Sequence, residues 1–161
     1  MKKKTIVSEI SIFEDLAELT KKEQELLHRA EQARENAYAP YSRFKVGAAV
    51  RLENDEIIIG SNQENASFPS GLCAERVAVF HAGASFPGVA VKTVAIVAAP
   101  ENAASAKPAA PCGNCRQAIY EYESRQEKPI SILMMGSDGR VIKCTSMADL
   151  LPLAFNNHFL G

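Results

Sequence analysis

Apolar residues along the chain recur first at every second position and then at helical spacing. Three isoleucines within residues 4–12 share one face at a period of two, which predicts an edge strand or an extended arm. The next segment begins with Thr20-x-x-Glu23, a capping-box pattern that marks the start of a helix. Pro40 ends this helical region. The apolar residues behind the cap form one helical stripe, made of Leu26, Leu27, Ala30, Ala33 and Ala37.

Two hairpins are predicted where short, β-rich runs flank turn residues. The turns are Asn54-Asp55 and Ser137-Asp138-Gly139. The paired runs are residues 44–52 with 56–61, and residues 130–135 with 140–145. Between the hairpins, residues 92–99 form an apolar run typical of a buried strand, followed by a loop over residues 101–108.

Three further segments are predicted to be helical. Residues 73–82 form one helix, which Gly83 is expected to stop, and residues 113–126 form the next. Ser146 caps a short final helix that ends before Pro152.

The order of these elements predicts an α/β fold. We expect a three-layer α-β-α sandwich with one mixed, five-stranded sheet and helices on both faces. The length of 161 residues suits a single core. Residues 1–20 are interpreted as an N-terminal extension, an arm or edge strand, and residues 21–161 as one domain.

Charge and composition exclude several functional classes. The net charge is −1, whereas nucleic-acid binders usually carry a basic surplus, so a small-molecule substrate is favoured. No apolar run is long enough to span a membrane. The basic start at Met1 is soon followed by acidic residues, unlike a signal or transit peptide. We therefore expect a cytoplasmic protein with neither membrane nor nucleic acid as a partner.

The strongest chemical signal is Cys73-Ala74-Glu75 followed by Pro111-Cys112-Gly113-Asn114-Cys115. Three thiolates can bind one zinc ion and leave its fourth tetrahedral position open, which is the mark of a catalytic site. A glutamate two residues after the first thiolate is well placed to move protons at an activated water. Zinc, water and a carboxylate that does not bind the metal are the machinery of hydrolytic deamination.

Other uses of the cysteines are open. With Cys144 the set could form a closed four-cysteine structural site, and Cys112 with Cys115 could form a redox pair. However, Cys144 lies alone in a strand-like stretch, and no thioredoxin-like context surrounds the Cys-x-x-Cys motif. A disulfide framework is not expected in a chain of this size without a secretory signal.

The predicted elements place the metal site at the N-termini of two helices. Cys73 opens one helix, and Cys112 and Cys115 open the next, one turn apart. Helix N-termini carry partial positive charge and free N–H groups, and both favour thiolates. Both helices follow strands of one sheet, so their N-termini should meet at one end of it.

From about Ala37 to Phe155 the chain resembles the small, homotetrameric, three-cysteine cytidine deaminases. The resemblance rests on motifs in matching order: Ala37-Tyr38-Ala39-Pro40-Tyr41-Ser42-x-Phe44-x-Val46-Gly47-Ala48-Ala49, Asn62-x-Glu64-Asn65-Ala66, Cys73-Ala74-Glu75-Arg76, Pro111-Cys112-Gly113-x-Cys115-Arg116-Gln117 and Leu150-Leu151-Pro152 before Phe155.

This resemblance implies an activity. The enzyme would convert cytidine and 2′-deoxycytidine to uridine and 2′-deoxyuridine in pyrimidine salvage, with release of ammonia. Cys73, Cys112 and Cys115 would bind one zinc ion per subunit. Glu75 would take a proton from the activated water, protonate N3 of cytosine and later pass a proton to the departing amine.

The resemblance also implies substrate contacts and an assembly. Asn62 and Glu64 match a pair that holds the ribose hydroxyls, and Phe44 an aromatic residue near the nucleoside. Further matches are Ala74 as a substrate-binding residue, Arg76 as a hydrogen-bond donor to the thiolates, and Phe155 as a residue reaching a neighbour's site. A homotetramer with shared active sites is expected.

Three other readings remain. They are deamination of a cytosine nucleoside antibiotic such as blasticidin S, deamination of cytosine in RNA or DNA, and a zinc module without catalysis. The Asn62-x-Glu64-Asn65 motif, the near-zero charge and Glu75 argue against them in that order. Departures from the commonest family pattern at Phe68, Ala110 and Asn114 concern base contacts and subunit packing. For each polar candidate residue, the alternative interpretation is an ordinary surface or turn position without a function.

Overall fold

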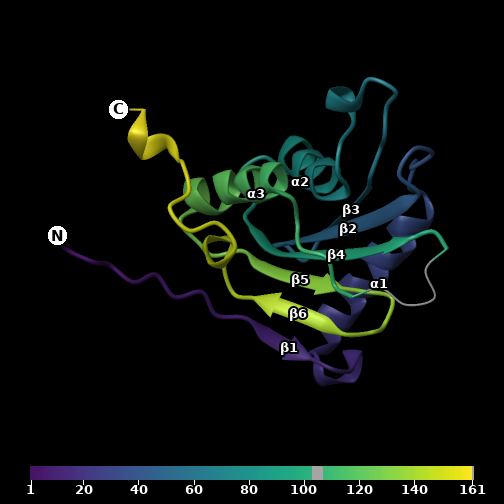
Figure 1. Cartoon of the computed structure of the whole chain (residues 1–161), viewed down its shortest axis with the longest axis horizontal. Coiled ribbons are helices and arrows are strands. Elements are labelled where there is room, and N and C mark those ends of the chain that lie inside the picture. Colours follow the sequence, from purple (N-terminus) through teal and green to yellow (C-terminus); the bar gives the residue numbers. More distant parts are fainter. Residues whose placement is uncertain (103–106, 161) are drawn as a thin grey trace.

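The structure is a computed structural model that describes residues 1–102 and 107–160 (Figure 1). Its α-helices are α1 (Lys21–Glu35), α2 (Ala74–Ser85) and α3 (Gly113–Gln126). Its strands are β1 (Ser11–Phe13), β2 (Phe44–Leu52), β3 (Ile57–Ser61), β4 (Val91–Pro100), β5 (Ser131–Met135) and β6 (Val141–Cys144). The loop predicted over residues 101–108 falls partly outside the described residues.

The strands form one mixed sheet in the order β1-β6-β5-β4-β2-β3. Strands β4 and β5 are parallel, and the other neighbouring pairs are antiparallel. The predicted mixed sheet is confirmed, but the predicted count of five strands is wrong because the N-terminal extension adds a sixth. Only Ser11–Phe13 of the extension pairs with β6, and Phe13 packs against the core. The apolar alternation farther toward the N-terminus resembles a strand equally well, so periodicity could not show where pairing begins.

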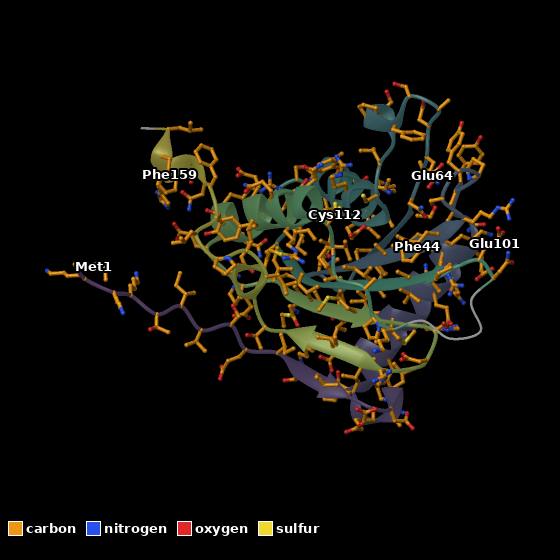
Figure 2. The ribbon with its side chains drawn as sticks, viewed as in Figure 1. Met1, Phe44, Glu64, Glu101, Cys112 and Phe159 are labelled. Carbon is orange, nitrogen blue, oxygen red and sulfur yellow. The ribbon has the colours of Figure 1, made fainter. Side chains whose placement is uncertain are left out.

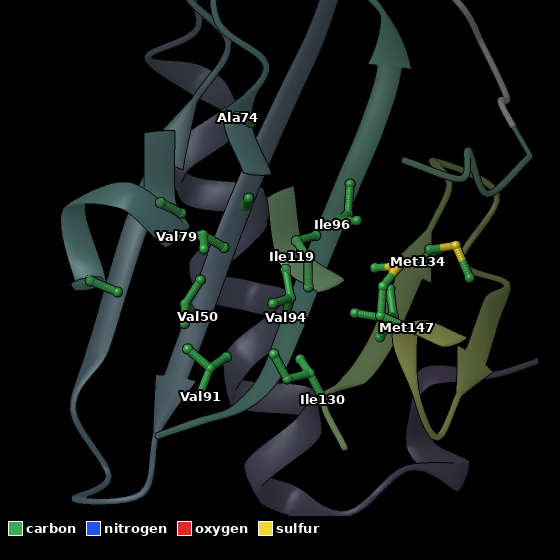
Figure 3. Packing of buried hydrophobic residues seen from close by; sticks show 14 of the residues in the cluster. Val50, Ala74, Val79, Val91, Val94, Ile96, Ile119, Ile130, Met134 and Met147 are labelled. Atoms are coloured by element: carbon green, nitrogen blue, oxygen red, sulfur yellow. The ribbon is translucent and has the colours of Figure 1, made fainter. Parts of the chain in front are cut away.

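The helices cover both faces of the sheet, as the element order predicts (Figure 1). Ala48 and Val50 of β2 face the core shared with α2 and α3, while Ala49 between them faces α1. Figure 3 shows the first of these cores, where Val79 of α2 and Ile119 of α3 lie over the strands. Because both faces are buried, β2 and β4 are almost continuously apolar.

Two glycines allow the helices to lie unusually close to the sheet. A Cβ on Gly47 would overlap the backbone of α1 at Ala30. A Cβ on Gly60 would lie 2.6 Å from the Ala78 nitrogen and 2.7 Å from the Ala74 oxygen, both in α2. Strand β3 therefore contacts the backbone of the helix that begins at Cys73.

The predicted helix ends are partly confirmed. Thr20 and Glu23 form the capping box of α1, and Ser146 caps a helix that is a single 3-10 turn, Met147–Asp149. The prediction that Gly83 stops α2 is wrong. The helix continues through Gly83 to Ser85. Position 83 is a glycine because the ring of Tyr122 fills the space that a side chain would take. Within the described part of the chain, no helix has both the length and the apolar character to cross a membrane.

Candidate metal centre and substrate pocket

The three cysteines of the two motifs come together at the N-termini of α2 and α3. Cys73 is the N-cap residue of α2, and Cys112 is the N-cap residue of α3. The Sγ atoms of Cys73 and Cys112 are 3.8 Å apart, and those of Cys112 and Cys115 are 3.6 Å apart. All three sulfurs lie within 4.8 Å of one another. The prediction that the two helix N-termini meet at one end of the sheet is confirmed.

These distances fit a zinc ion. Zinc–sulfur bonds of about 2.3 Å in a tetrahedron place the sulfurs roughly 3.8 Å apart. Two of the observed separations already match this spacing before any ligand moves. Cys144 is fully buried at the end of β6 and does not belong to the cluster. The donors therefore number three in the described residues, and this leaves a fourth position for water or substrate.

The cluster favours the thiolate form that binds metal. The hydrogen bond with Cys115 lowers the pKa of Cys73 to about 5, and Cys112 and Arg76 act in the same direction against the opposing effect of burial. Donation of that hydrogen bond, together with burial, raises the pKa of Cys115. Cys73 therefore loses its proton readily while Cys115 retains its own, so metal binding must displace the proton of Cys115. The side chains of Cys73 and Cys112 make no capping hydrogen bond to their helices. The backbone N–H groups of the first turn of each helix therefore point toward the end where the sulfurs lie.

Glu75 is a buried carboxyl group beside the thiols, with 4% of its surface exposed. Burial raises the pKa of Glu75, and the negative charge of Cys73 adds to this effect. A hydrogen bond with Cys115 opposes the rise. A carboxyl group whose pKa is moved toward neutrality is suited to take up and release protons.

Arg76 faces the same sulfurs from the next position of α2. Burial lowers the pKa of Arg76, but its hydrogen bond and charge interaction with Cys73 raise it above the ordinary value overall. The Nε atom of Arg76 is buried and has no hydrogen-bond partner among the described residues. The guanidinium therefore offsets the negative charge that accumulates on the thiolates.

A pocket of about 530 Å³ opens beside Cys73 and Arg76. Its wall is largely apolar but carries three amide side chains and a carboxylate, which is typical of small-molecule sites. In Figure 2, Glu64 and Phe44 lie on the same side of the molecule. Cys112 lies between these two residues, on one side, and helix α3, on the other. The lining residues are Tyr41, Ser42, Asn62, Gln63, Glu64, Asn65, Phe68, Gly71, Leu72, Cys73 and Arg76.

Asn62 lies in this pocket but is held by the start of β2. Its Oδ1 accepts a hydrogen bond from the Val46 nitrogen at 2.9 Å, and its Nδ2 donates to the Phe44 oxygen at 2.9 Å. The side chain thus continues the pairing between β2 and β3 past the end of β3. One N–H of the amide stays free to donate toward the pocket.

Glu64 is held by the loop that precedes β2. Its Oε2 accepts from the Tyr41 nitrogen at 2.9 Å and from the Ser42 nitrogen at 3.2 Å, and its Oε1 accepts from the Ser42 hydroxyl. The Ser42 hydrogen bond is the main cause that lowers the pKa of Glu64. Glu64 is therefore an anionic acceptor at neutral pH.

The remaining predicted substrate residues lie near or outside this pocket. Phe44 begins β2 and Ala74 is fully buried in the first turn of α2, and neither lines the pocket within the chain. Phe155 is 55% exposed and its ring stacks on Phe159 at 5.5 Å. Phe159 lies at the opposite side of the view from Glu64 (Figure 2). A contribution of Phe155 to a pocket would therefore concern a neighbouring chain.

Sequence reasoning missed several parts of the pocket. Tyr41 and Phe68 form an aromatic wall, with ring centroids 5.8 Å apart, and Leu72 extends it. Ser42 belonged to a recognised motif, but no function was predicted for it. The available signal was two aromatic residues, Tyr41 and Phe68, in polar, turn-rich segments, because loops often carry binding residues.

The arrangement defines a class of enzyme, because three thiols at helix N-termini beside a buried carboxyl group fit zinc-dependent hydrolytic chemistry. Residues 20–128 match the family described as "Cytidine and deoxycytidylate deaminase zinc-binding region". The chain belongs to this deaminase family, and the cofactor of its three-cysteine site is zinc, one ion per chain.

Named relatives agree with this assignment. The chain is 39% identical to a cytidine deaminase of Sporosarcina psychrophila over 139 residues, which cover 86% of this chain and 94% of the relative. A crystal structure of cytidine deaminase from Burkholderia pseudomallei is 40% identical and has a TM-score of 0.73, covering 85% of this chain and all of that one. A second, from Mycobacterium leprae, is 34% identical with a TM-score of 0.62 and covers 80% and 95% of the two chains. The similarity thus extends over nearly the whole of each relative.

Proposed function

We propose that this enzyme deaminates free cytidine and 2′-deoxycytidine to uridine and 2′-deoxyuridine, with water consumed and ammonia released. The observation that carries the proposal is a three-thiol cluster with a buried Glu75, next to a pocket that Cys73 lines together with Asn62 and Glu64. The relatives' names include cytidine. We propose that the reaction serves pyrimidine salvage in the cytoplasm.

The pocket supports a nucleoside rather than a nucleotide. Among the lining residues that the structure describes, Glu64 is a carboxylate and Arg76 is the only cation. Arg76 already interacts with Cys73. A 5′-phosphate would meet negative charge without a free cationic partner, whereas sugar hydroxyls can donate to Glu64.

The chain's own residues divide the chemistry between them. Cys73, Cys112 and Cys115 would hold zinc, which when bound supplies a Lewis acid that makes a water molecule more acidic. Glu75 takes a proton from that water and delivers it to N3 of cytosine as C4 is attacked. Glu75 then takes the proton of the hydroxyl group newly bound to C4 and transfers it to the amino group, so that the C4 carbonyl forms and the amine leaves as ammonia. Arg76 stabilises the thiolates, while Asn62 and Glu64 hold the ribose and Phe44 packs near the nucleoside.

We also propose a homotetramer with shared active sites, in which Phe155 reaches a neighbour's pocket. The exposure of Phe155 and Phe159, a stacked aromatic pair, supports a protein-covered position in the assembly. Sedimentation at assay concentrations measures this directly, and a fully active monomer would contradict it.

The activity is tested with four substrates: cytidine, 2′-deoxycytidine, dCMP and blasticidin S. Purified, zinc-loaded enzyme is incubated with each one, and ammonia release is followed. We expect turnover of the two nucleosides and little of dCMP. Preferential turnover of dCMP or blasticidin S would overturn the substrate assignment, and release from none of the four would overturn the proposed reaction.

A further inference from the structure

The hydroxyl group of Ser42 connects two parts of the pocket that are far apart in sequence. The Phe44 nitrogen donates a hydrogen bond to Ser42 Oγ at 3.0 Å. The same oxygen contacts Glu64 Oε1. Because Glu64 is anionic and can only accept, the hydroxyl hydrogen of Ser42 is donated to Glu64. The direction of both hydrogen bonds is therefore fixed.

The two oxygens of Glu64 are occupied unequally. Oε2 accepts two backbone N–H groups, from Tyr41 and Ser42. Oε1 accepts only the Ser42 hydroxyl. A carboxylate has about four acceptor positions, so one position remains, and it is on Oε1. Glu64 lines the pocket together with Asn62, which brings this acceptor to the sugar end.

The turn that carries Ser42 is held in place by its neighbours. Arg43 has a φ of 54°, in the left-handed region that costs a non-glycine residue free energy, so the turn persists only where its surroundings fix it. The Arg43 nitrogen donates to the Ala39 oxygen at 3.0 Å, and the Arg43 oxygen accepts from the Glu101 nitrogen at 2.7 Å. The Ser42 hydroxyl is thus presented by an ordered loop.

We propose that Ser42 is a positioning residue for the deaminase reaction. Its hydroxyl fixes the carboxylate of Glu64 so that the remaining position on Oε1 accepts a hydroxyl hydrogen from the sugar of the substrate. This inference rests on the proposed nucleoside function. It adds that the sugar of the substrate must donate a hydrogen bond to Glu64, because the remaining position on the carboxylate can only accept one.

The test compares Ser42→Ala with Ser42→Thr, which keeps a hydroxyl, and with Ser70→Ala, which removes a hydroxyl outside the pocket. Cytidine, 2′-deoxycytidine, 3′-deoxycytidine and 2′,3′-dideoxycytidine are the substrates. We expect Ser42→Ala to raise KM for cytidine about tenfold with kcat and zinc content unchanged, since a hydrogen bond to a charged group is disturbed. Ser42→Thr should restore most of the loss, and Ser70→Ala should behave as wild type.

The dideoxy substrate separates positioning from general damage. Ser42→Ala should have no further effect on kcat/KM for 2′,3′-dideoxycytidine, and none for cytidine in a Glu64→Gln background. An equal loss with every substrate, or an unchanged KM for cytidine, would overturn the role of Ser42. Neither result would touch the proposed function, which is tested separately by ammonia release from the four substrates with the wild-type enzyme.

Discussion

The two ends of the pocket are built in different ways. At the metal end, Cys73, Cys112 and Cys115 occupy the first positions of two helices, and Cys115 and Glu75 are buried. At the other end, which we propose binds the sugar and call the sugar end, Glu64 lies beyond the end of β3 and is held by hydrogen bonds from a loop. One end is thus fixed by regular secondary structure, and the other by side chains bonded to backbone.

The two ends of the pocket should therefore respond differently to amino-acid substitution. A substitution at the metal end alters charge in a buried site, where electrostatic effects are large. A substitution at the sugar end alters a hydrogen bond that water can partly replace, so its effects should be smaller. Substitutions at the two ends test this contrast.

Removal of a thiol should have the largest effect. In Cys73→Ala or Cys115→Ala two thiols remain, so we expect loss of bound zinc and of activity. Metal analysis of the purified protein together with an ammonia assay measures both. Cys144→Ala is the matched control, because Cys144 is buried away from the cluster and should leave zinc in place. Zinc loss in the Cys144 variant would show that the site is closed by a fourth cysteine.

Replacement of Glu75 by glutamine should abolish proton transfer while preserving shape. General acid–base groups contribute roughly 10²–10⁴-fold, and this one serves several steps, so kcat should fall at least that far with zinc retained. Steady-state kinetics with parallel zinc analysis tests this. Glu121→Gln, an exposed change on α3, is the control. Near-normal turnover by the Glu75 variant would rule out its role.

Arg76→Gln should produce an intermediate loss. Removal of the guanidinium leaves the charge of the thiolates uncompensated, and changes around metal ligands typically cost about 10–100-fold in affinity or activity. We expect lower kcat and weaker zinc retention during dialysis against a chelator. Arg29→Gln, which removes an exposed arginine of α1, should change neither. Wild-type kinetics and zinc content in the Arg76 variant would leave the helix N-termini as the source of compensation.

Asn62→Ala should lower stability as well as weaken nucleoside binding. It leaves the Val46 nitrogen and the Phe44 oxygen without their partners, so the free energy of unfolding should fall by about 1–3 kcal/mol. Zinc should be retained, because the metal end does not depend on this amide. Urea unfolding measures the loss, and Asn65→Ala, at a more exposed asparagine, is the control. Unchanged stability would mean that water replaces both hydrogen bonds.

The metal end could be predicted from sequence because its determinants are local. Cys73 and Cys112 are adjacent to their helices, and both helix starts were expected where they occur. The sugar end depends on residues 22 positions apart, Ser42 and Glu64, and no local pattern shows that they meet. The position of Gly83 inside α2 was missed for the same reason, since Tyr122 of another helix fills the space beside it.

The close contact at Gly60 brings β3 against the backbone of α2. Gly60 is two residues from Asn62 in the chain, and its missing side chain lets β3 lie against the Ala74 oxygen, one residue from Cys73. A side chain at Gly60 would push the strand that leads to Asn62 away from the helix that follows Cys73, so this glycine keeps two parts of the pocket lining close together.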